Sequence, residues 1–447
     1  MGSHARTYPA RATVGRPRCV VASRATIMGL AAFLTLALSG CGASSTPSPT
    51  PSATPTATGS ATASATATAT SSATAIPVPT ATPHPTLPPT LRFVATGSMH
   101  TARDGATATL LKNGKVLIAG GGKLVNGLSN DVYSSAELYD SATSTFTPTG
   151  SMTSARNNAM ATLLANGKVL IAGGNGCDDP KQCTAVNVGA FLASAELYDP
   201  ATGKFTRTGS MTADREGLSA ATLLPDGKVL IVGESEWADV YDPSTGKFTR
   251  TGGTPVVRYD TATLLPNGKV LATGSSWDND VVAQLYDESS GQFTTVSLAL
   301  PPGTPIVKHE GHPVERSWPN TATLLPDGRV VLFEGGYLET YDPATGKCAD
   351  AGYVSPPDSL YGEWSAVTAT LLSDGLVLFI GGINESETVT AMLYDPTDGL
   401  TRTGAMLVAR GGNTATLLRD DSVLITGGYD DNASNGDPLA SAELFEP

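Results

Sequence analysis

The chain has 447 residues, of which 28 are lysine or arginine and 41 are aspartate or glutamate, so its formal net charge is -13. Phosphate binding needs a basic surface, so nucleic acid is not expected to be a partner of this acidic protein. The sequence contains no Ser-His-Asp order, phosphate-binding loop or pair of carboxylates at catalytic spacing, and the common hydrolase and nucleotide-binding classes are therefore not indicated.

Residues 1–40 are predicted to be a lipoprotein signal peptide. Five arginines without an acidic residue precede an apolar run from Ile27 to Leu38, which is too short to span a bilayer. The run leads through Ser39 and Gly40 to Cys41, the expected site of lipid attachment. An ordinary secretory signal with a chance cysteine is the alternative. We expect an exported protein, anchored to the outer face of a bacterial membrane only by the lipid on Cys41.

Residues 41–90 are predicted to be a disordered tether. The segment consists mainly of Ser, Thr, Ala and Pro and has no charged residue. Such a composition offers too little apolar surface to form a packed core. We expect an extended spacer between the lipid and the folded domain at 91–447.

One sequence block recurs seven times between residue 91 and the end of the chain, with an average length of 51 residues. Its first half has the pattern Ala-Thr-Leu-Leu-x-x-Gly-Lys-Val-Leu-Ile-Ala-Gly-Gly. Its second half carries an aromatic residue at Tyr139, Tyr198, Tyr241, Tyr286, Tyr341, Tyr394 and Phe445. This period is typical of propeller blades and too long for repeats of helical pairs.

Each block is predicted to form four antiparallel strands. Asn-Gly or Asp-Gly pairs, such as Asn113-Gly114 and Asp226-Gly227, separate two apolar runs, and this setting predicts a hairpin with a type I′ turn. The second run is apolar without alternation, as expected of a strand that is covered on both faces. An Asp-Pro-x-Thr-Gly-Lys turn then joins the third strand to a fourth that carries phenylalanine.

The ends of the repeat region predict how the ring closes. Arg92 to Met99 match a fourth strand with no block before it, while the chain stops at Glu446-Pro447, where the fourth strand of the last block should begin. We therefore expect the N-terminal strand to complete the last blade and leave no open seam.

The double glycine, the Tyr-Asp that follows it and the Met-x-x-Ala-Arg before the first strand resemble the kelch family throughout residues 91–447, although Phe stands where kelch repeats usually carry Trp. The resemblance implies an all-β fold: a seven-bladed kelch-type β-propeller with four antiparallel strands per blade. The segment from Leu324 to Val330 is most similar to the propeller of the galactose oxidase and glyoxal oxidase group.

The resemblance to those copper oxidases implies a need for two tyrosines, two histidines and a cysteine that is crosslinked to one of the tyrosines. This chain has Tyr259-Asp260 where they have Tyr-His, and no further domain follows to supply the last histidine. We therefore expect no copper, no other metal and no cofactor. Sialic acid mutarotase, another kelch enzyme, would need only Arg and Glu groups at the mouth of the ring, so an enzyme acting on carbohydrate stays open as the alternative.

Variation among the blocks is confined to one face of the predicted ring. The loops after the second and fourth strands differ in length, whereas the turns on the other face are short and nearly identical. Insertions on one face indicate a binding surface. All tryptophans are assigned to these loops, where they could form a wall for sugar rings or merely fix the loops in place: Trp237, Trp277, Trp318 and Trp364.

An arginine recurs just before the first strand, at Arg103, Arg156, Arg215, Arg258, Arg316 and Arg410. A ring of guanidinium groups could bind a carboxylate or sulfate ligand. The alternative is structural, because acids on the third strand, such as Glu137, Glu196 and Asp239, could pair with these arginines between blades.

The remaining cysteines and histidines point to structure. Export favours a disulfide between Cys177 and Cys183, which share one insertion. Cys348 replaces the phenylalanine of the fourth strand and is expected to be buried and inert. His309, His312 and Glu315 lie in a segment rich in Pro and Gly without a fixed third ligand, so solvated loop residues are expected rather than a metal site.

These features predict a monomeric, lipid-anchored propeller that serves as a binding or scaffold module for a carbohydrate or a cell-surface protein. A propeller enzyme acting on carbohydrate is the competing hypothesis, since the fold alone does not determine the function.

Overall fold

The computed structural model describes residues 92–125, 128–179, 190–215, 220–233, 235, 237–253, 257–276, 281–298, 321–334, 337–353, 365–383, 390–399, 401–430 and 437–447. They belong to one compact unit, Thr74–Pro447. The regular elements of these ranges are β-strands. No helix in this part of the chain is long and apolar enough to cross a membrane.

The strands form consecutive antiparallel sheets of four strands, numbered by the chain order of their first strands. The first sheet contains β2 (Asp104–Leu110), β3 (Val116–Val125), β5 (Ala136–Asp140) and β6 (Thr145–Pro148), with β4 (Leu128–Val132) paired to β3. The second contains β8 (Met160–Leu163), β9 (Val169–Ala172), β12 (Ala195–Asp199) and β13 (Lys204–Arg207). The third contains β14 (Ala220–Leu223), β15 (Val229–Val232), β16 (Trp237–Asp242) and β17 (Lys247–Gly253).

The other sheets repeat this order. The fourth contains β18 (Val257–Leu264), β19 (Val270–Ser276), β20 (Val281–Asp287) and β21 (Gln292–Val296). The fifth contains β22 (Thr321–Leu324), β23 (Val330–Glu334), β24 (Tyr337–Asp342) and β25 (Lys347–Tyr353). The sixth contains β26 (Ser365–Leu371), β27 (Val377–Ile383), β28 (Thr390–Tyr394) and β29 (Thr401–Ala405). The seventh contains β30 (Thr414–Leu417), β31 (Val423–Thr426), β32 (Ala442–Glu446) and β1 (Arg92–Ala95).

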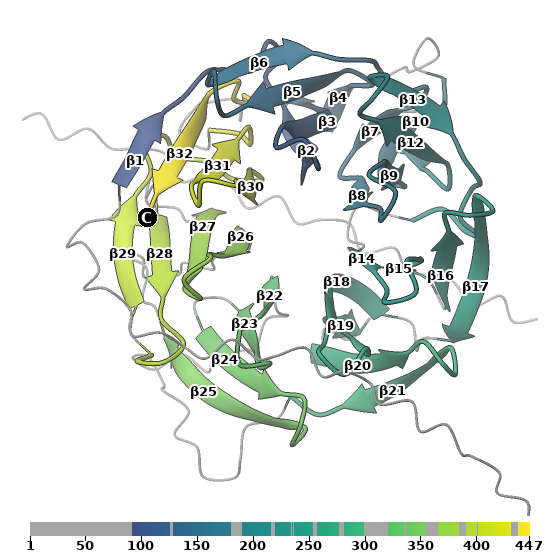
Figure 1. Ribbon diagram of the computed structural model, residues 1–447, viewed down its shortest axis with the longest axis vertical. Helices are drawn as coiled ribbons and strands as arrows, with labels where there is room; N and C mark the ends of the chain where they lie inside the picture. Colours follow the sequence, from purple (N-terminus) through teal and green to yellow (C-terminus); the bar gives the residue numbers. More distant parts are fainter. Residues whose placement is uncertain are drawn as a thin grey trace, which may run out of the picture. The chain divides into compact units, whose positions relative to one another are not determined.

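Strands from the two ends of the domain lie side by side. Strand β1 pairs with β32, with Phe93 opposite Phe445 and Ala95 opposite Glu443. The first strands of neighbouring sheets contact one another, and β30 contacts β2. Figure 1 shows the sheets following one another around a common centre, with these first strands innermost. The all-β architecture of four-stranded antiparallel sheets is consistent with a β-propeller.

The apolar core lies between neighbouring sheets. One cluster joins Leu117 and Ala119 of β3 to Val169 and Ile171 of β9, and all four side chains are buried. The predicted third-strand tyrosines are buried as well, and Tyr198 packs against Phe205 with ring centroids 4.8 Å apart. Cys348 is buried in β25, as expected from its sequence position. The continuous apolar pattern of the second strands thus reflects contact with neighbours on both faces.

The hairpins between first and second strands are not type I′ turns, so that prediction is wrong. The Gly114 amide donates to the Leu111 carbonyl, and the Leu111 amide donates to the Lys115 carbonyl. Gly114 alone has positive φ, at 87°, while the Asn113 side chain accepts from the Lys115 amide. This is a three-residue loop in which a type I turn precedes a left-handed glycine. The Asn-Gly pair correctly located the hairpin. The glycine, however, follows the two central residues of the turn, whereas a type I′ turn would have it as the second central residue.

Two copies of the repeat place another residue where the turn needs a left-handed glycine. Asp421 has φ of 68° in the hairpin of the seventh sheet, and Ser144 has φ of 53° in the turn between β5 and β6. Side chains other than glycine are strained in this region. We predict that Asp421→Gly raises the free energy of unfolding by about 0.5–1 kcal/mol, measured by urea denaturation. Asp421→Ala, which keeps a Cβ there, should not stabilise the protein.

A Thr-Gly pair at the end of the fourth strand connects one sheet to the next in several copies of the repeat. The Thr149 hydroxyl hydrogen-bonds to the Tyr198 hydroxyl at 2.9 Å, and the Gly150 amide donates to the Gly203 carbonyl at 3.0 Å. The same pair of bonds recurs at Thr96-Gly97, Thr208-Gly209 and Thr251-Gly252. The repeated Thr-Gly is therefore an inter-sheet contact that was not predicted from the sequence.

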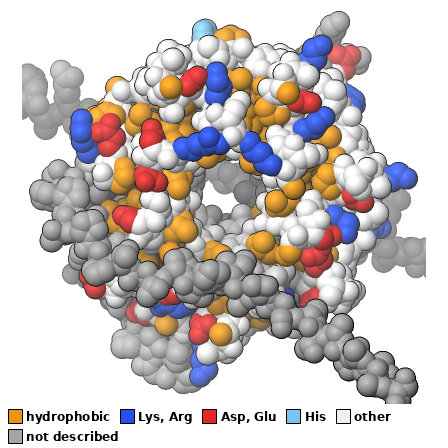
Figure 2. Space-filling view, in the orientation of Figure 1, with side chains coloured by type: hydrophobic (Ala, Val, Ile, Leu, Met, Phe, Trp, Pro, Cys, Tyr) orange, Lys and Arg blue, Asp and Glu red, His pale blue; other side chains and the backbone are white. Residues whose placement is uncertain are grey.

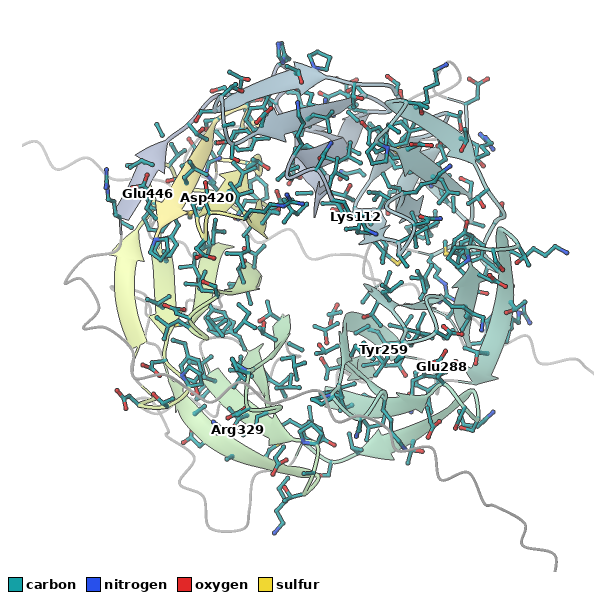
Figure 3. All side chains as sticks on the ribbon, in the orientation of Figure 1. Lys112, Tyr259, Glu288, Arg329, Asp420 and Glu446 are labelled. Atoms are coloured by element: carbon teal, nitrogen blue, oxygen red, sulfur yellow. The ribbon has the colours of Figure 1, made fainter. Side chains whose placement is uncertain are left out.

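Hairpins of neighbouring sheets also contact one another on the face that carries the short turns. Arg419 donates to the Lys112 carbonyl, and Lys112 donates to the Ala165 carbonyl. Figure 2 shows lysine and arginine side chains at the rim of the central hollow, and Figure 3 places Lys112 at the inner edge of the sheets. The Arg419 and Lys112 side chains are bound to backbone carbonyl oxygens of neighbouring hairpins, which indicates a role in joining these hairpins.

Candidate functional site

The loop face, where the connections after second and fourth strands lie, carries the recurrent arginines. Arg103, Arg156 and Arg410 are buried, and each donates through Nη1 to two backbone carbonyls of its own sheet. Each also pairs with an acid on the third strand: Glu137 at 3.1 Å, Glu196 at 3.5 Å and Glu443 at 2.9 Å. We call these three arginines with their acids the arginine clamps.

The acid of each clamp also holds the segment that arrives from the preceding sheet. Both oxygens of Glu196 accept backbone amides, from Thr153 at 2.7 Å and Ser154 at 2.9 Å. Burial pushes the pKa of Glu137 upwards, but hydrogen bonds from the His100 amide, the His100 ring and Arg103 outweigh burial and hold the pKa below its ordinary value. The clamp pairs are thus formed within a sheet rather than between blades, and their burial supports the structural interpretation of the arginines.

A second group of polar side chains on this face includes buried atoms without a hydrogen-bond partner among the described residues. Asp104 begins β2, Asn157 precedes β8 and Asn413 precedes β30, and all three are buried. Oδ1 of Asn157 and both Oδ1 and Nδ2 of Asn413 have no hydrogen-bond partner among the described residues. Unpaired buried amides are costly, and a site that needs a ligand or water is one reason to keep them. We call these three residues the Asp104 cluster.

Two glycines next to members of the cluster allow close contacts between neighbouring sheets. A Cβ at Gly412, beside Asn413, would lie 2.6 Å from Oδ1 of Asp104. A Cβ at Gly105, beside Asp104, would lie 1.8 Å from Oδ1 of Asn157. Both glycines have φ near 60°, a left-handed conformation that glycine adopts without strain. The Asp104 side chain thus lies against Gly412 of the seventh sheet, and the Asn157 side chain, next to the second sheet, lies against Gly105 of the first.

Aromatic side chains lie next to the cluster. Cε1 of Tyr429 is 3.5 Å from the Cβ position at Gly412, and the Tyr429 residue is half-buried. Tyr133 is half-buried and lies with its ring centroid 5.7 Å from the Arg103 guanidinium carbon. An ion pair of 3.1 Å between Lys123 and Asp437 links the first and seventh sheets on this side. The cluster thus combines buried polar groups with partly exposed aromatic rings.

Burial raises the pKa of the Asp104 carboxyl to about 6, opposed only weakly by a hydrogen bond from the Gly105 amide. Since its ordinary pKa is 3.8, the folded protein holds this proton at pH values where the unfolded chain has released it. The free energy of unfolding should therefore fall as pH rises from about 4 to about 6, by roughly 2 kcal/mol from this group.

We predict that Asp104→Asn removes this part of the pH dependence. The measurement is urea denaturation of both proteins at pH 4, 5, 6 and 7, with the difference between them isolating Asp104 from other titrating groups. Equal pH profiles for the two proteins would contradict the prediction.

Trp237 does not lie in a loop, so its predicted place is corrected. It is the first residue of β16 and occupies the position of the serine that precedes the third strand in the first, second and seventh sheets. The Arg250 guanidinium carbon lies 3.7 Å from the centroid of its ring, and its Nε1 is buried without a partner among the described residues. Its backbone carbonyl accepts from Arg215 at 2.8 Å.

Several predicted site residues lie outside the described residues: Trp277, Trp318, Trp364, Arg316, His309, His312, Glu315, Cys183, Cys41 and the side chain of Arg258. Cys177 ends β10 (Asn175–Cys177) and is disulfide-bonded. Strand β10 pairs with β7 (Ala155–Asn157) and β11 (Ala190–Phe191) in a small extra sheet that was not predicted. The pairing of Cys177 with Cys183 stays a prediction.

The Asp104 cluster was not predicted from the sequence. Asp104 and Asn157 each directly follow a recurrent arginine, and Asn413 follows one by three residues. Asp and Asn at these positions, next to Gly105 and Gly412 in two of the three cases, could have drawn attention to the start of the first strand.

The residues near Tyr259 do not fit a copper site. Tyr259, labelled in Figure 3, is fully buried, and its hydroxyl donates to Oε1 of Gln284. The next residue is Asp260 rather than histidine. Within the described ranges, no three His, Cys, Asp or Glu side chains are grouped so that they could hold a metal ion. The side chains around Tyr259 therefore do not support copper oxidase chemistry at this position.

No protein-family model and no curated protein matches the chain. Among solved structures, a novel fungal alcohol oxidase with catalytic diversity among the AA5 family, in complex with copper, is similar with a TM-score of 0.56 and 17% identity. The alignment covers 80% of this chain and 76% of that one. At this identity the likeness concerns the fold alone. The chain thus has an all-β, propeller-like fold similar to that of this fungal protein.

Proposed function

We propose that the protein is an exported, lipid-anchored, seven-bladed kelch-type propeller that binds a carbohydrate through its loop face. The Asp104 cluster is the centre of the proposed site. The proposal rests above all on the Asn413 amide, which is buried with neither its oxygen nor its nitrogen bonded among the described residues.

The blade count and closure are supported by the repeats and by strand contacts. The seven copies of the sequence block coincide with the four-stranded sheets of the described residues, and β1 from the start of the domain pairs with β32 from its end. The repeated double glycine and Tyr-Asp favour the kelch type. Closure of this kind removes the edge strands that would otherwise pair with other chains.

The anchor is supported by the sequence around Cys41. A basic stretch, a short apolar run and a Leu-Ser-Gly-Cys sequence precede a charge-free spacer. Cys41→Ser is expected to abolish lipid incorporation, measured by mass spectrometry of the exported protein. An unchanged lipid mass would contradict the anchor without affecting the proposed binding site.

The ligand class follows from hydrogen-bonding capacity. Asn413 offers one donor group and one acceptor, and Asn157 offers a further acceptor. A metal cation would be coordinated only by the amide oxygens and would leave the Asn413 nitrogen without a hydrogen-bond partner. A hydroxyl group can both donate and accept, so a polyol satisfies the whole set. Neighbouring Tyr429 and Tyr133 supply flat apolar surface of the kind that sugar rings contact.

The test is a thermal-shift screen of the full chain against a panel of neutral oligosaccharides, followed by calorimetric titration of any that bind. Asn413→Leu keeps the approximate size of the side chain but removes both polar atoms. It is expected to weaken binding at least tenfold without loss of stability, because a buried unpaired amide is removed. Asp131→Asn, which changes an exposed side chain of the first sheet, is the matched control.

Equal affinity of Asn413→Leu and the wild-type protein would contradict this site. A panel without any binding would contradict the carbohydrate proposal and favour the alternative from the sequence, a cell-surface protein as partner.

A further inference from the structure

The repeated clamps provide an internal comparison for each arginine. In the clamps of Arg103, Arg156 and Arg410, Nη2 donates to the hydroxyl of the serine that directly precedes Ala-Glu on the third strand. These serines are Ser135, Ser194 and Ser441, at 2.9, 2.8 and 3.1 Å. Nη1 is bonded to two carbonyls in all three. The serine and the carbonyls thus satisfy both terminal nitrogens of the arginine.

The third sheet breaks this pattern at Arg215. Trp237-Ala238-Asp239 stands where the first, second and seventh sheets have Ser-Ala-Glu. Nη2 of Arg215 donates to the Trp237 carbonyl and to Asp239, each at 2.8 Å. Nη1 is fully buried with no partner among the described residues, while the Gly233 carbonyl accepts from the Ser235 amide instead. In the third sheet Nη1 thus lacks the two carbonyl acceptors that it has in the other clamps, whereas Nη2 remains paired without the serine hydroxyl.

The replacement also adds a donor. The indole Nε1 of Trp237 can only donate, and it is buried without a partner in the described part of the chain. Nε of Arg215 is also unpaired, but so is Nε of Arg103 and of Arg156, so that atom does not distinguish the third sheet. What distinguishes it is the pair Nη1 and Nε1, two donors that require an acceptor. A guanidinium with a further N–H matches the oxygens of a carboxylate.

The second sheet shows that a carboxylate fits beside such a clamp. The Asp178 carboxylate accepts from the hydroxyls of Ser154 at 3.0 Å and Ser194 at 2.5 Å, and lies 3.7 Å from Nη2 of Arg207. Ser194 occupies the repeat position of Trp237, and Arg207 occupies that of Arg250. In the second sheet the chain itself thus supplies an anion between these two positions.

We propose that Arg215 and Trp237 form a binding site for the carboxylate of a small external anion, of the kind carried by a uronic acid. Nη1 of Arg215 and Nε1 of Trp237 donate to the carboxylate oxygens. Arg250, which is exposed and stacked on the Trp237 ring, adds positive charge next to the indole. This site does not depend on the Asp104 cluster or on the binding of a neutral sugar there.

The test is calorimetric titration of the full chain with sodium D-glucuronate at constant ionic strength, with D-glucose as the neutral control. Saturable binding of glucuronate and not of glucose is expected. Trp237→Phe removes only the indole donor and should weaken binding about tenfold or more. Trp237→Ser removes the whole indole and installs the residue of the first, second and seventh sheets, so it should abolish binding while the protein stays folded by circular dichroism.

Absence of saturable glucuronate binding by the wild-type protein would overturn the proposal, and so would equal affinity of Trp237→Phe. A double variant, Glu234→Gln with Glu236→Gln, tests whether a carboxylate of the chain itself fills the site. Glucuronate binding by this variant but not by the wild-type protein would overturn the proposal. Loss of neutral sugar binding in Asn413→Leu should not change glucuronate binding. The carbohydrate site and the carboxylate site can therefore be refuted independently of each other.

Discussion

Glu196→Ala is expected to lower the free energy of unfolding by about 3–5 kcal/mol, the largest loss that we predict for a single substitution. The side chains of Glu196 and Arg156 are fully buried. Removing the carboxylate would leave a buried guanidinium without its counter-charge and would also unbind the Thr153 and Ser154 amides. Equilibrium denaturation in urea measures the loss.

The control for this variant is Glu446→Gln. Glu446 pairs with Arg92 at 2.9 Å, but their side chains are 39% and 71% exposed. Solvent screens such a pair, so a change below about 1 kcal/mol is expected. A similarly small loss for Glu196→Ala would mean that the clamps do not hold the sheets together.

Gly150→Ala should cost about 3–4 kcal/mol. A Cβ at this position would lie 2.2 Å from the Gly203 carbonyl oxygen, which is backbone and cannot rotate away. The chain would have to move apart there and lose the Gly150 to Gly203 bond together with the contact between Thr149 and Tyr198. Urea denaturation again gives the change, and the predicted cause is lost contact between the first and second sheets.

Gly346→Ala separates steric contact from backbone strain. Gly346 has φ of 67° but no atom within 4 Å of its Cβ position. The substitution should lower the free energy of unfolding by about 1 kcal/mol, because only the strain of a left-handed backbone conformation is added. Equal losses for the two glycine variants would show that close approach between sheets is not what requires Gly150.

The all-β fold was predictable from the sequence because every copy of the block repeats the same turn residues and apolar runs. A single Asn-Gly pair would be ambiguous, whereas repetition locates the strands around Gly114, Gly167 and Gly227. The predicted turn type was wrong because both kinds of hairpin use the same residue pair, and only the backbone bonds distinguish them.

The candidate site was largely missed because it depends on contacts between distant parts of the chain. Asp104 and Gly412 are neighbours only when the first and seventh sheets adjoin. The recurrent arginines were visible in the sequence because they repeat with the period of the blocks. Such repetition is typical of residues with a structural role. The surroundings of Arg215 differ from those of Arg156 by Trp237 in place of Ser194 and Asp239 in place of Glu196, and these differences have meaning only once the strands are paired.

The pH dependence of sugar affinity is the decisive measurement for the Asp104 cluster. A sugar hydroxyl that donates to the carboxylate favours its ionised form, so binding should release a proton near the raised pKa of about 6. Calorimetric titration with an oligosaccharide from the screen should give roughly tenfold weaker binding at pH 5 than at pH 7.5, and no such change for Asp104→Asn. Wild-type affinity that does not vary with pH, or that varies equally in the variant, would contradict the assignment of this cluster as the sugar site.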